Sequence, residues 1–332
     1  MQGPDTQGPS SPSFTSFSSP DGIAFCRNIA SKSLPWDPHD YQLEGACKAL
    51  DGIDVFAITP TGSGKTGFLL VYILVAQAIA NDPALCPGAL RTRFKADPCM
   101  LVFCPTKALE HDMEPKFQAA GLSTLVINAN TTKAAAAVRR DGNLWKVGLS
   151  KKAVILLSPE QLATPGFFSL INDPSFAARI MALNVDEAHL LDSWGAQFRP
   201  LFREIGNVRA RLPGNPILIA LTATICPGPQ TKTVMEFFGM RQCHVIRRSN
   251  ARYDVRWIFR TTDAGPTSRE FPELDWVLEG DRRVIIFCET ISFAHRILSY
   301  LRRKAKHLPG YKDRVRVFTS ISSESYVSKT LE

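Results

Sequence analysis

The chain has 332 residues, of which 45% are hydrophobic, so it is long enough for about two domains and is not disordered throughout. Its formal net charge of +8 is unevenly spread, because residues 1–240 hold 21 Lys/Arg and 20 Asp/Glu whereas residues 241–332 hold 18 and 11. A basic C-terminal segment suits a polyanionic partner. The alternative is a piece of a longer protein whose acidic complement lies elsewhere.

The eight cysteines form no Cys-x-x-Cys pair, which favours reduced core thiols of an intracellular protein over a zinc site or a disulfide scaffold. The polar N-terminus shows no secretory signal. The strongest apolar run, from Phe68 to Ala80, is shorter than the roughly 20 residues of a membrane span, so we expect a buried helix there and no membrane partner. In a eukaryote, the nucleus is the expected compartment.

Residues 1–22 are rich in Ser, Pro and Gly and predict a disordered tail, and residues 23–246 predict one folded domain. Its apolar runs show no in/out alternation, which indicates strands buried on both faces and thus an α/β fold with a parallel sheet between two helix layers. The expected strands are Asp54–Thr59, Met100–Cys104, Thr124–Ile127, Ala153–Ser158, Met181–Asp186 and Pro216–Leu221, and the expected helices include Lys65–Ala80 and Thr106–Ala119.

Residues 247–332 predict a second, incomplete domain. The expected strands are Val255–Phe259, Arg283–Cys288 and Val315–Thr319, too few to close a sheet of the first domain's size. The helix after the second of them has one apolar face, formed by Ala294, Ile297, Leu298 and Leu301.

A glycine-rich loop separates the first strand from the first long helix. It reads Thr59, Pro60, Thr61, Gly62, Ser63, Gly64, Lys65 and Thr66. Strand, loop and helix together predict a phosphate-binding loop, in which backbone N–H groups and the helix N-terminus hold the phosphates of ATP. Lys65 would pair with the β- and γ-phosphates and the Thr66 hydroxyl would hold Mg²⁺. Thr59 replaces the usual first glycine, so the strict motif is not met.

Two carboxylates follow the apolar run Met181–Val185, in the sequence Asp186-Glu187-Ala188-His189. A strand that ends this way places both at the carboxyl edge of the sheet, where ligands bind in open α/β folds. Asp186 would hold Mg²⁺, and Glu187 would orient and deprotonate the attacking water. His189 is a further catalytic candidate, although alone it could be an ordinary helix-start histidine.

With these motifs in order, the chain resembles superfamily 2 helicases, the DEAD/DEAH-box class with two RecA-like lobes. The resemblance implies that Gln42 reads adenine, although His39 stands where the family usually has arginine. It implies a coupling role for Thr222 and Thr224. Two further strand-end loops would touch the nucleic-acid backbone through Thr106, Lys107, Ser158 and Glu160.

The segment after the acidic pair narrows the resemblance to RecQ-type DNA helicases. Trp194, Phe198 and Arg199 resemble the aromatic-rich loop that links DNA contact to ATP hydrolysis in that family, although a spacing of four also fits a core-facing helical stripe. Residues 249–253 resemble the RecQ-type crossing into the second lobe.

The resemblance implies an ATP-dependent 3′-to-5′ DNA helicase with ATP and Mg²⁺ as cofactors and DNA as partner. RNA stays open as an alternative partner, as does a non-enzymatic ATP- and nucleic-acid-binding remnant. No arginine-bearing motif of the second lobe is recognisable before Glu332, so we expect an incomplete motor with weak ATPase activity.

Overall fold

The computed structural model describes residues 14–138, 142–193, 200–251, 254–256, 258–259, 261, 264–265, 267–280, 282–319 and 321–331. The chain divides into two compact units, Met1–Ala251 and Arg252–Glu332, close to the boundary expected at residue 246. Each unit has its own buried side chains.

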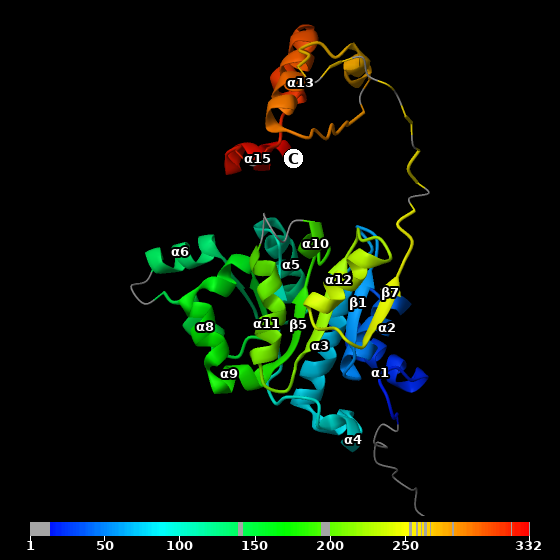
Figure 1. Ribbon diagram of the computed structural model, residues 1–332, viewed down its shortest axis with the longest axis vertical. Helices are drawn as coiled ribbons and strands as arrows, with labels where there is room; N and C mark the ends of the chain where they lie inside the picture. Colours follow the sequence, from blue (N-terminus) through cyan, green and yellow to red (C-terminus); the bar gives the residue numbers. More distant parts are fainter. Residues whose placement is uncertain are drawn as a thin grey trace, which may run out of the picture. The chain divides into compact units, whose positions relative to one another are not determined.

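The first unit is built on a parallel sheet in the strand order β3-β4-β2-β5-β6-β1-β7 (Figure 1). The strands are β1 Asp54–Ile58, β2 Cys99–Phe103, β3 Thr124–Ile127, β4 Val154–Leu157, β5 Ile180–Val185, β6 Ile217–Thr222 and β7 Cys243–Arg247. The six strands expected from the sequence are confirmed within one or two residues. The edge strand β7 was not predicted, because only Ile246 in it is fully buried and its apolar pattern is correspondingly weak.

Helices cover both faces of this sheet, which confirms the predicted fold class. The α-helices are α1 Pro20–Ser31, α2 Asp40–Leu50, α3 Thr66–Asn81, α4 Gly88–Arg91, α5 Lys107–Ala119, α6 Ala129–Val138, α7 Leu144–Gly148, α8 Pro165–Asn172, α9 Pro174–Arg179, α10 Leu190–Ser193, α11 Glu204–Arg211 and α12 Pro229–Phe237. Helices α1, α2, α3 and α5 contribute to one buried cluster, and α8, α9, α11 and α12 contribute to the other. The apolar run expected to be a buried helix is α3. No helix in the described part of the chain is both long and apolar enough to cross a membrane.

The expectation of a disordered tail over residues 1–22 is wrong for residues 14–22. Phe14 and Phe17 are 5% and 0% exposed, and α1 begins at Pro20. The backbone N–H groups of Phe17 and Ser18 donate to the Asp51 carboxylate at 2.8 and 2.9 Å. Two phenylalanines supply enough apolar surface to hold a segment whose composition otherwise suggests disorder.

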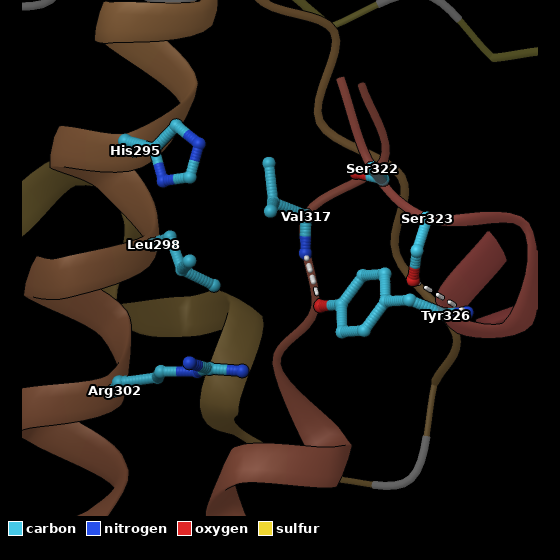
Figure 2. A pocket seen from close by; sticks show the side chains of 7 residues that line it. All are labelled: His295, Leu298, Arg302, Val317, Ser322, Ser323 and Tyr326. Carbon is cyan, nitrogen blue, oxygen red and sulfur yellow. Dashed lines mark hydrogen bonds between the residues drawn. The ribbon is translucent and has the colours of Figure 1, made fainter. Parts of the chain in front are cut away.

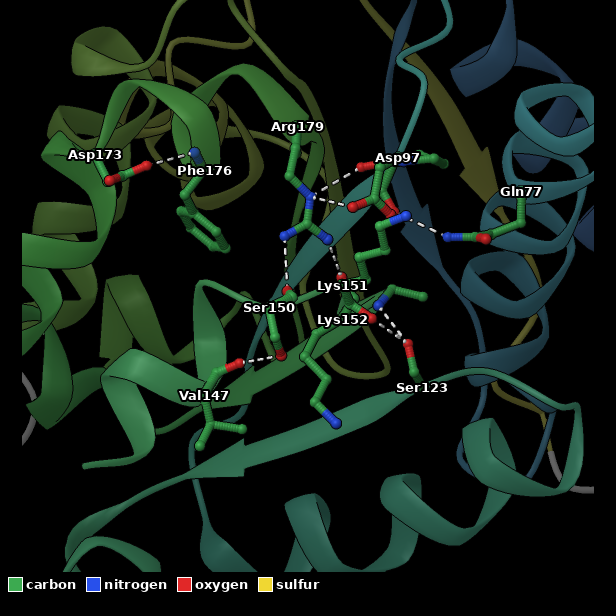
Figure 3. A network of polar contacts seen from close by, with 12 residues as sticks. Gln77, Asp97, Ser123, Val147, Ser150, Lys151, Lys152, Asp173, Phe176 and Arg179 are labelled. Carbon is green, nitrogen blue, oxygen red and sulfur yellow. Dashed lines mark hydrogen bonds and ion pairs between the residues drawn. The ribbon is translucent and has the colours of Figure 1, made fainter. Parts of the chain in front are cut away.

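Two buried or half-buried arginines hold strands together at their N-terminal ends. Arg179 donates to the backbone carbonyls of Asp97, Ser150 and Lys152 at 2.8–3.1 Å and thereby joins the starts of β2, β4 and β5 (Figure 3). Arg209 of α11 makes two 2.7 Å hydrogen bonds to the carboxylate of Asp54 at the start of β1. Both contacts lie at the sheet edge opposite the predicted nucleotide loop.

The second unit packs around helix α13, Ile291–Lys304, whose buried side chains are Ile297, Tyr300 and Leu301. The remaining α-helices are α14 Tyr311–Arg314 and α15 Glu324–Leu331. The apolar face predicted for α13 is confirmed at Ile297 and Leu301.

The prediction of three strands in the second unit is wrong, because none of the residues that the structure describes there forms a strand. Segments 283–288 and 315–319 have no strand partner. Ile286 and Cys288 pack against the α13 cluster, whereas Ile285 and Phe287 are 79% and 92% exposed. The side chains alternate as in a strand, but a strand forms only where a neighbouring backbone completes the hydrogen-bond ladder.

Candidate nucleotide and nucleic-acid site

The glycine-rich loop connects β1 to α3, as predicted. Gly62 and Gly64 have φ angles of +83° and +74°, a left-handed conformation that other residues adopt only at a cost. The buried Thr59 accepts a hydrogen bond at 3.0 Å from the Ser63 hydroxyl and so closes the loop on itself. Its backbone N–H donates to the carbonyl of Thr222 at the end of β6, at 2.9 Å. The threonine that replaces the first glycine of the strict motif therefore adds a side-chain hydrogen bond across the loop.

Two side chains of helix α2 make hydrogen bonds to this loop. Gln42 is only 1% exposed; its amide Nε2 donates to the Gly64 carbonyl at 2.6 Å, and its Oε1 accepts from the His39 N–H at 2.9 Å. The next residue of importance is Tyr41, whose hydroxyl donates to the Ser63 carbonyl at 2.5 Å. A Cβ at Gly67 would lie 2.4 Å from Gln42 Nε2, so this position must be glycine for the amide to reach the loop. The sequence predicted that Gln42 reads adenine, whereas in this structure both ends of its amide are engaged by Gly64 and His39. The contacts of Tyr41 and Gly67 were not predicted.

The acidic pair lies in a tight turn after β5, between the ends of β2 and β6. The backbone N–H of Asp186 donates to the Phe103 carbonyl at 3.1 Å, and that of Ala188 donates to the Leu221 carbonyl at 2.9 Å. Glu187 has a φ of +52°, which is strained for a residue with a side chain. Such strain is found most often where function demands a particular side-chain direction.

The pKa values of the two carboxylates are shifted in opposite directions. Burial, followed by the neighbouring Glu187 charge, raises the pKa of Asp186 to about 6, against the opposing effects of Lys65 and His189. The hydrogen bond from His189, opposed by burial, lowers the pKa of Glu187. Glu187 therefore stays ionised down to a lower pH than an ordinary glutamate, while the buried Asp186 carboxylate favours a nearby cation.

His189 joins the acidic turn to the end of β6. Its Nδ1 lies 2.8 Å from the Thr222 hydroxyl and 3.3 Å from Glu187 Oε2. Since the Thr222 carbonyl also accepts from Thr59, a continuous set of contacts connects the strand ends of β5, β6 and β1. Thr224, two residues further along the chain, is exposed, and its N–H lies 3.4 Å from the Thr222 hydroxyl.

The glycine-rich loop and the Asp-Glu turn lie at the same edge of a parallel sheet. Comparison with known protein families agrees with this arrangement. The DEAD/DEAH box helicase family model matches residues 39–231. The chain belongs to the DEAD/DEAH box helicases. Within this family its relatives include RecQ-type proteins, which confirms the resemblance drawn from the sequence.

The relatives are longer than this helicase chain. The ATP-dependent DNA helicase RecQ of Haemophilus influenzae is 26% identical over 264 residues, which cover 79% of this chain and 37% of the relative. The ATP-dependent DNA helicase Q1 of Pongo abelii is 31% identical over 226 residues, 65% of this chain and 30% of the relative. The chain thus spans between 30% and 37% of the length of these two relatives.

A solved structure supports the helicase fold independently. The crystal structure of DUF1998 helicase MrfA bound to DNA and AMPPNP aligns over 87% of this chain and 39% of that chain, with a TM-score of 0.60. At 18% sequence identity the likeness concerns the fold alone.

The predicted nucleic-acid residues of the helicase follow β2 and β4, which are neighbours in the sheet. Thr106 is exposed and caps α5, because its hydroxyl accepts from the Leu109 N–H at 3.3 Å. Lys107 is exposed and donates to Asn130 at 2.8 Å. Glu160 is exposed, whereas Ser158 is 5% exposed and its side chain is not open to a ligand in this structure.

The proposed aromatic-rich loop lies outside the described residues at Trp194, Phe198 and Arg199. The crossing element is described in part, up to Ala251. There the Asn250 side-chain amide donates to the carbonyl of Ala223, which lies between the two coupling threonines. Sequence reasoning named the crossing only as a resemblance and did not foresee this contact.

A separate cavity of 410 Å³ lies within the second unit (Figure 2). It is lined by His295, Leu298, Arg302, Val317, Ser322, Ser323 and Tyr326. The Tyr326 hydroxyl accepts from the Val317 N–H at 3.3 Å, and Arg302 is occupied by the carbonyls of Val315 and Lys312. The sequence placed Leu298 on the apolar face of helix α13 and predicted no functional role for any residue of the lining.

Proposed function

We propose that this helicase chain binds ATP and Mg²⁺ at the glycine-rich loop and hydrolyses ATP to drive DNA unwinding in the 3′-to-5′ direction, as part of a RecQ-type motor. The observation that supports the proposal is that the carboxyl ends of β1, β5 and β6 are connected by hydrogen bonds and polar contacts. The contacts from Thr59 through Thr222 and His189 to Glu187 join the nucleotide loop to the acidic turn.

The nucleotide roles follow from the positions of the side chains. The left-handed glycines turn backbone N–H groups toward the phosphates, and the N-terminus of α3 adds its positive end. Lys65, whose charge acts on both carboxylates of the acidic turn, would pair with the β- and γ-phosphates. Tyr41 and Gln42 would keep the loop in its binding shape through the Ser63 and Gly64 carbonyls.

The residues present fit a magnesium ion. Among the described residues no three His, Cys, Asp or Glu side chains cluster to hold a metal, but Mg²⁺ typically takes only one or two protein ligands beside phosphate and water. Asp186 and the Thr66 hydroxyl would hold it, and the buried Asp186 carboxylate gains a cation that offsets its burial. When bound, the ion neutralises phosphate charge.

Glu187 would orient the attacking water and accept its proton. Its lowered pKa keeps the carboxylate ionised. Because His189 contacts both Glu187 and Thr222, a change at Glu187 during hydrolysis would be transmitted to the end of β6. From there Thr224 and the Asn250 contact to Ala223 would pass the change toward the crossing segment.

DNA is preferred over RNA as the partner. The Trp194, Phe198 and Arg199 segment resembles the RecQ-type DNA-linked loop, and the relatives carry DNA helicase names. Since the chain covers only part of those relatives, DNA unwinding is proposed for the motor to which it belongs.

The test is ATP turnover by the purified chain with single-stranded DNA, with single-stranded RNA and with no polynucleotide. Glu187→Gln serves as the blank, and Lys65→Ala tests nucleotide binding by titration of a fluorescent ATP analogue. Stimulation by DNA alone supports the RecQ-type proposal, and equal stimulation by RNA contradicts the DNA preference. Unchanged nucleotide affinity in Lys65→Ala would refute the assignment of the loop. Binding without turnover above the blank would favour the non-enzymatic alternative for this chain.

A further inference from the structure

Helix α6, Ala129–Val138, follows the edge strand β3 and has no buried residue among its ten. It stands at the side of the sheet opposite β7 (Figure 1). A helix of this length has little stability of its own in water, and one without a buried face gains little from packing. Something other than hydrophobic burial must therefore hold α6 in place.

The anchor is Asn128, which is 1% exposed and directly precedes the helix. Its Oδ1 accepts from the backbone N–H groups of Asn130 and Thr131 at 2.8 and 3.0 Å. Its Nδ2 donates at 2.5 Å to the carboxylate of Glu110, a fully buried residue of α5. The start of α6 is thereby fixed to α5, the helix that begins with the predicted nucleic-acid contact.

A second link joins the exposed surfaces of the same two helices. The Lys107 ammonium of α5 donates to the Asn130 side-chain oxygen at 2.8 Å, and both residues are exposed. Asn130 and the exposed Lys133 are three residues apart and share one face of α6. Lys107, Asn130 and Lys133 therefore form a polar surface with two cationic groups.

The charge and place of this surface indicate its partner. Helix α6 itself holds one lysine and no acidic residue, and Lys107 adds a second positive charge beside it. In the sheet order, β3, β4 and β2 lie together on one side of β5, while β6 and β1, whose ends carry the nucleotide contacts, lie on the other. The carboxyl ends of parallel strands share one edge, so α6 extends the half of that edge that holds Thr106 and Lys107.

We propose that α6 is a docking surface for a nucleic-acid strand, whose sugar-phosphate backbone contacts Lys107, Asn130 and Lys133. Asn130 orients the Lys107 ammonium, and the buried Glu110–Asn128 contact fixes the spacing of the two helices. The inference rests on the proposed nucleic-acid function and extends it to a helix for which the sequence predicted no role. Recognition is of the phosphate backbone and carries no sequence preference.

The experiment is fluorescence anisotropy of a labelled oligo-dT with the full chain between 50 and 300 mM salt. Each phosphate contact to a single strand contributes about 0.7 to the slope of log affinity against log salt, so Lys133→Ala lowers that slope by about 0.7. Asn130→Ala keeps every charge; it weakens binding by about threefold to tenfold with the slope unchanged. Lys116→Ala, which removes an exposed lysine from the last turn of α5, is the matched control and leaves both values unchanged.

Two readouts separate the possible failures. Lys133→Gln repeats the test with a side chain of similar length, and affinity for a fluorescent ATP analogue, equal to that of the unsubstituted chain, shows that each variant is folded. If the unsubstituted chain does not bind oligo-dT, the proposed nucleic-acid function fails. If it binds, and both Lys133 variants retain its affinity and its salt slope, only the α6 surface is overturned.

Discussion

Asp186→Asn should stabilise the nucleotide-free, magnesium-free protein although it removes a predicted metal ligand. Burial raises the pKa of Asp186 to about 6 in the folded chain, whereas an unfolded chain has an aspartate pKa of about 3.9. The difference of about two units corresponds to roughly 3 kcal/mol. An asparagine keeps an oxygen that can accept the 2.9 Å hydrogen bond from the Glu187 N–H but has no charge to bury.

The pH dependence follows from the sign of this shift. Below about pH 4 the carboxyl is protonated in both states and contributes nothing to the free energy of unfolding. Between about pH 4 and pH 6 only the unfolded state ionises, so stability falls as pH rises, and above pH 6 the full cost remains. The stability advantage of Asp186→Asn should therefore be small at pH 4.5 and reach as much as about 3 kcal/mol at pH 7.5.

The assay is thermal unfolding in EDTA from pH 4.5 to 8, where 1 kcal/mol corresponds to about 2–4 °C for a domain of this size. Glu187→Gln is the matched control. Its native pKa is lowered, so that carboxylate contributes stability above its unfolded pKa, and its removal should lower the melting temperature at pH 7.5. The reasoning is refuted if Asp186→Asn melts no higher than the unsubstituted chain at pH 7.5, or if its advantage does not shrink toward pH 4.5.

Three other substitutions test separate parts of the structure. Arg209→Ala leaves the buried Asp54 carboxylate without its ion pair and should cost about 3–5 kcal/mol in urea unfolding; an effect below 1 kcal/mol would contradict the importance of this contact. Tyr41→Phe removes only the hydroxyl that holds the Ser63 carbonyl, and should weaken binding of a fluorescent ATP analogue by about threefold to tenfold with little change in melting temperature. His189→Ala should reduce ATP turnover by more than tenfold while nucleotide affinity stays unchanged, since the histidine contacts Glu187 and Thr222; a loss of affinity instead would place it in the binding site.

The local sequence was sufficient for the central strands and the nucleotide loop, and insufficient at the edges. Strand β5 is apolar apart from Asn184, and α3 is almost entirely apolar from Phe68 to Ala76, so their burial could be predicted directly. The edge strand β7 has one fully buried residue and was missed. In the second unit the segment 283–288 has the side-chain alternation of a strand, but the hydrogen-bond partners that make a strand are not specified by its own residues.

By itself, the sequence determined the fold class, the glycine-rich loop and the acidic turn, because each depends on neighbours within a few positions of the chain. Only the tertiary structure decided how these parts meet. Three hydrogen-bonded contacts join residues that are far apart in the sequence. The residues are 33 positions apart in the contact of His189 with Thr222, 22 in that of Tyr41 with Ser63, and 18 in that of Glu110 with Asn128 before α6. Such contacts depend on strand order and on the direction of each side chain, and a pattern of residues along one segment contains neither.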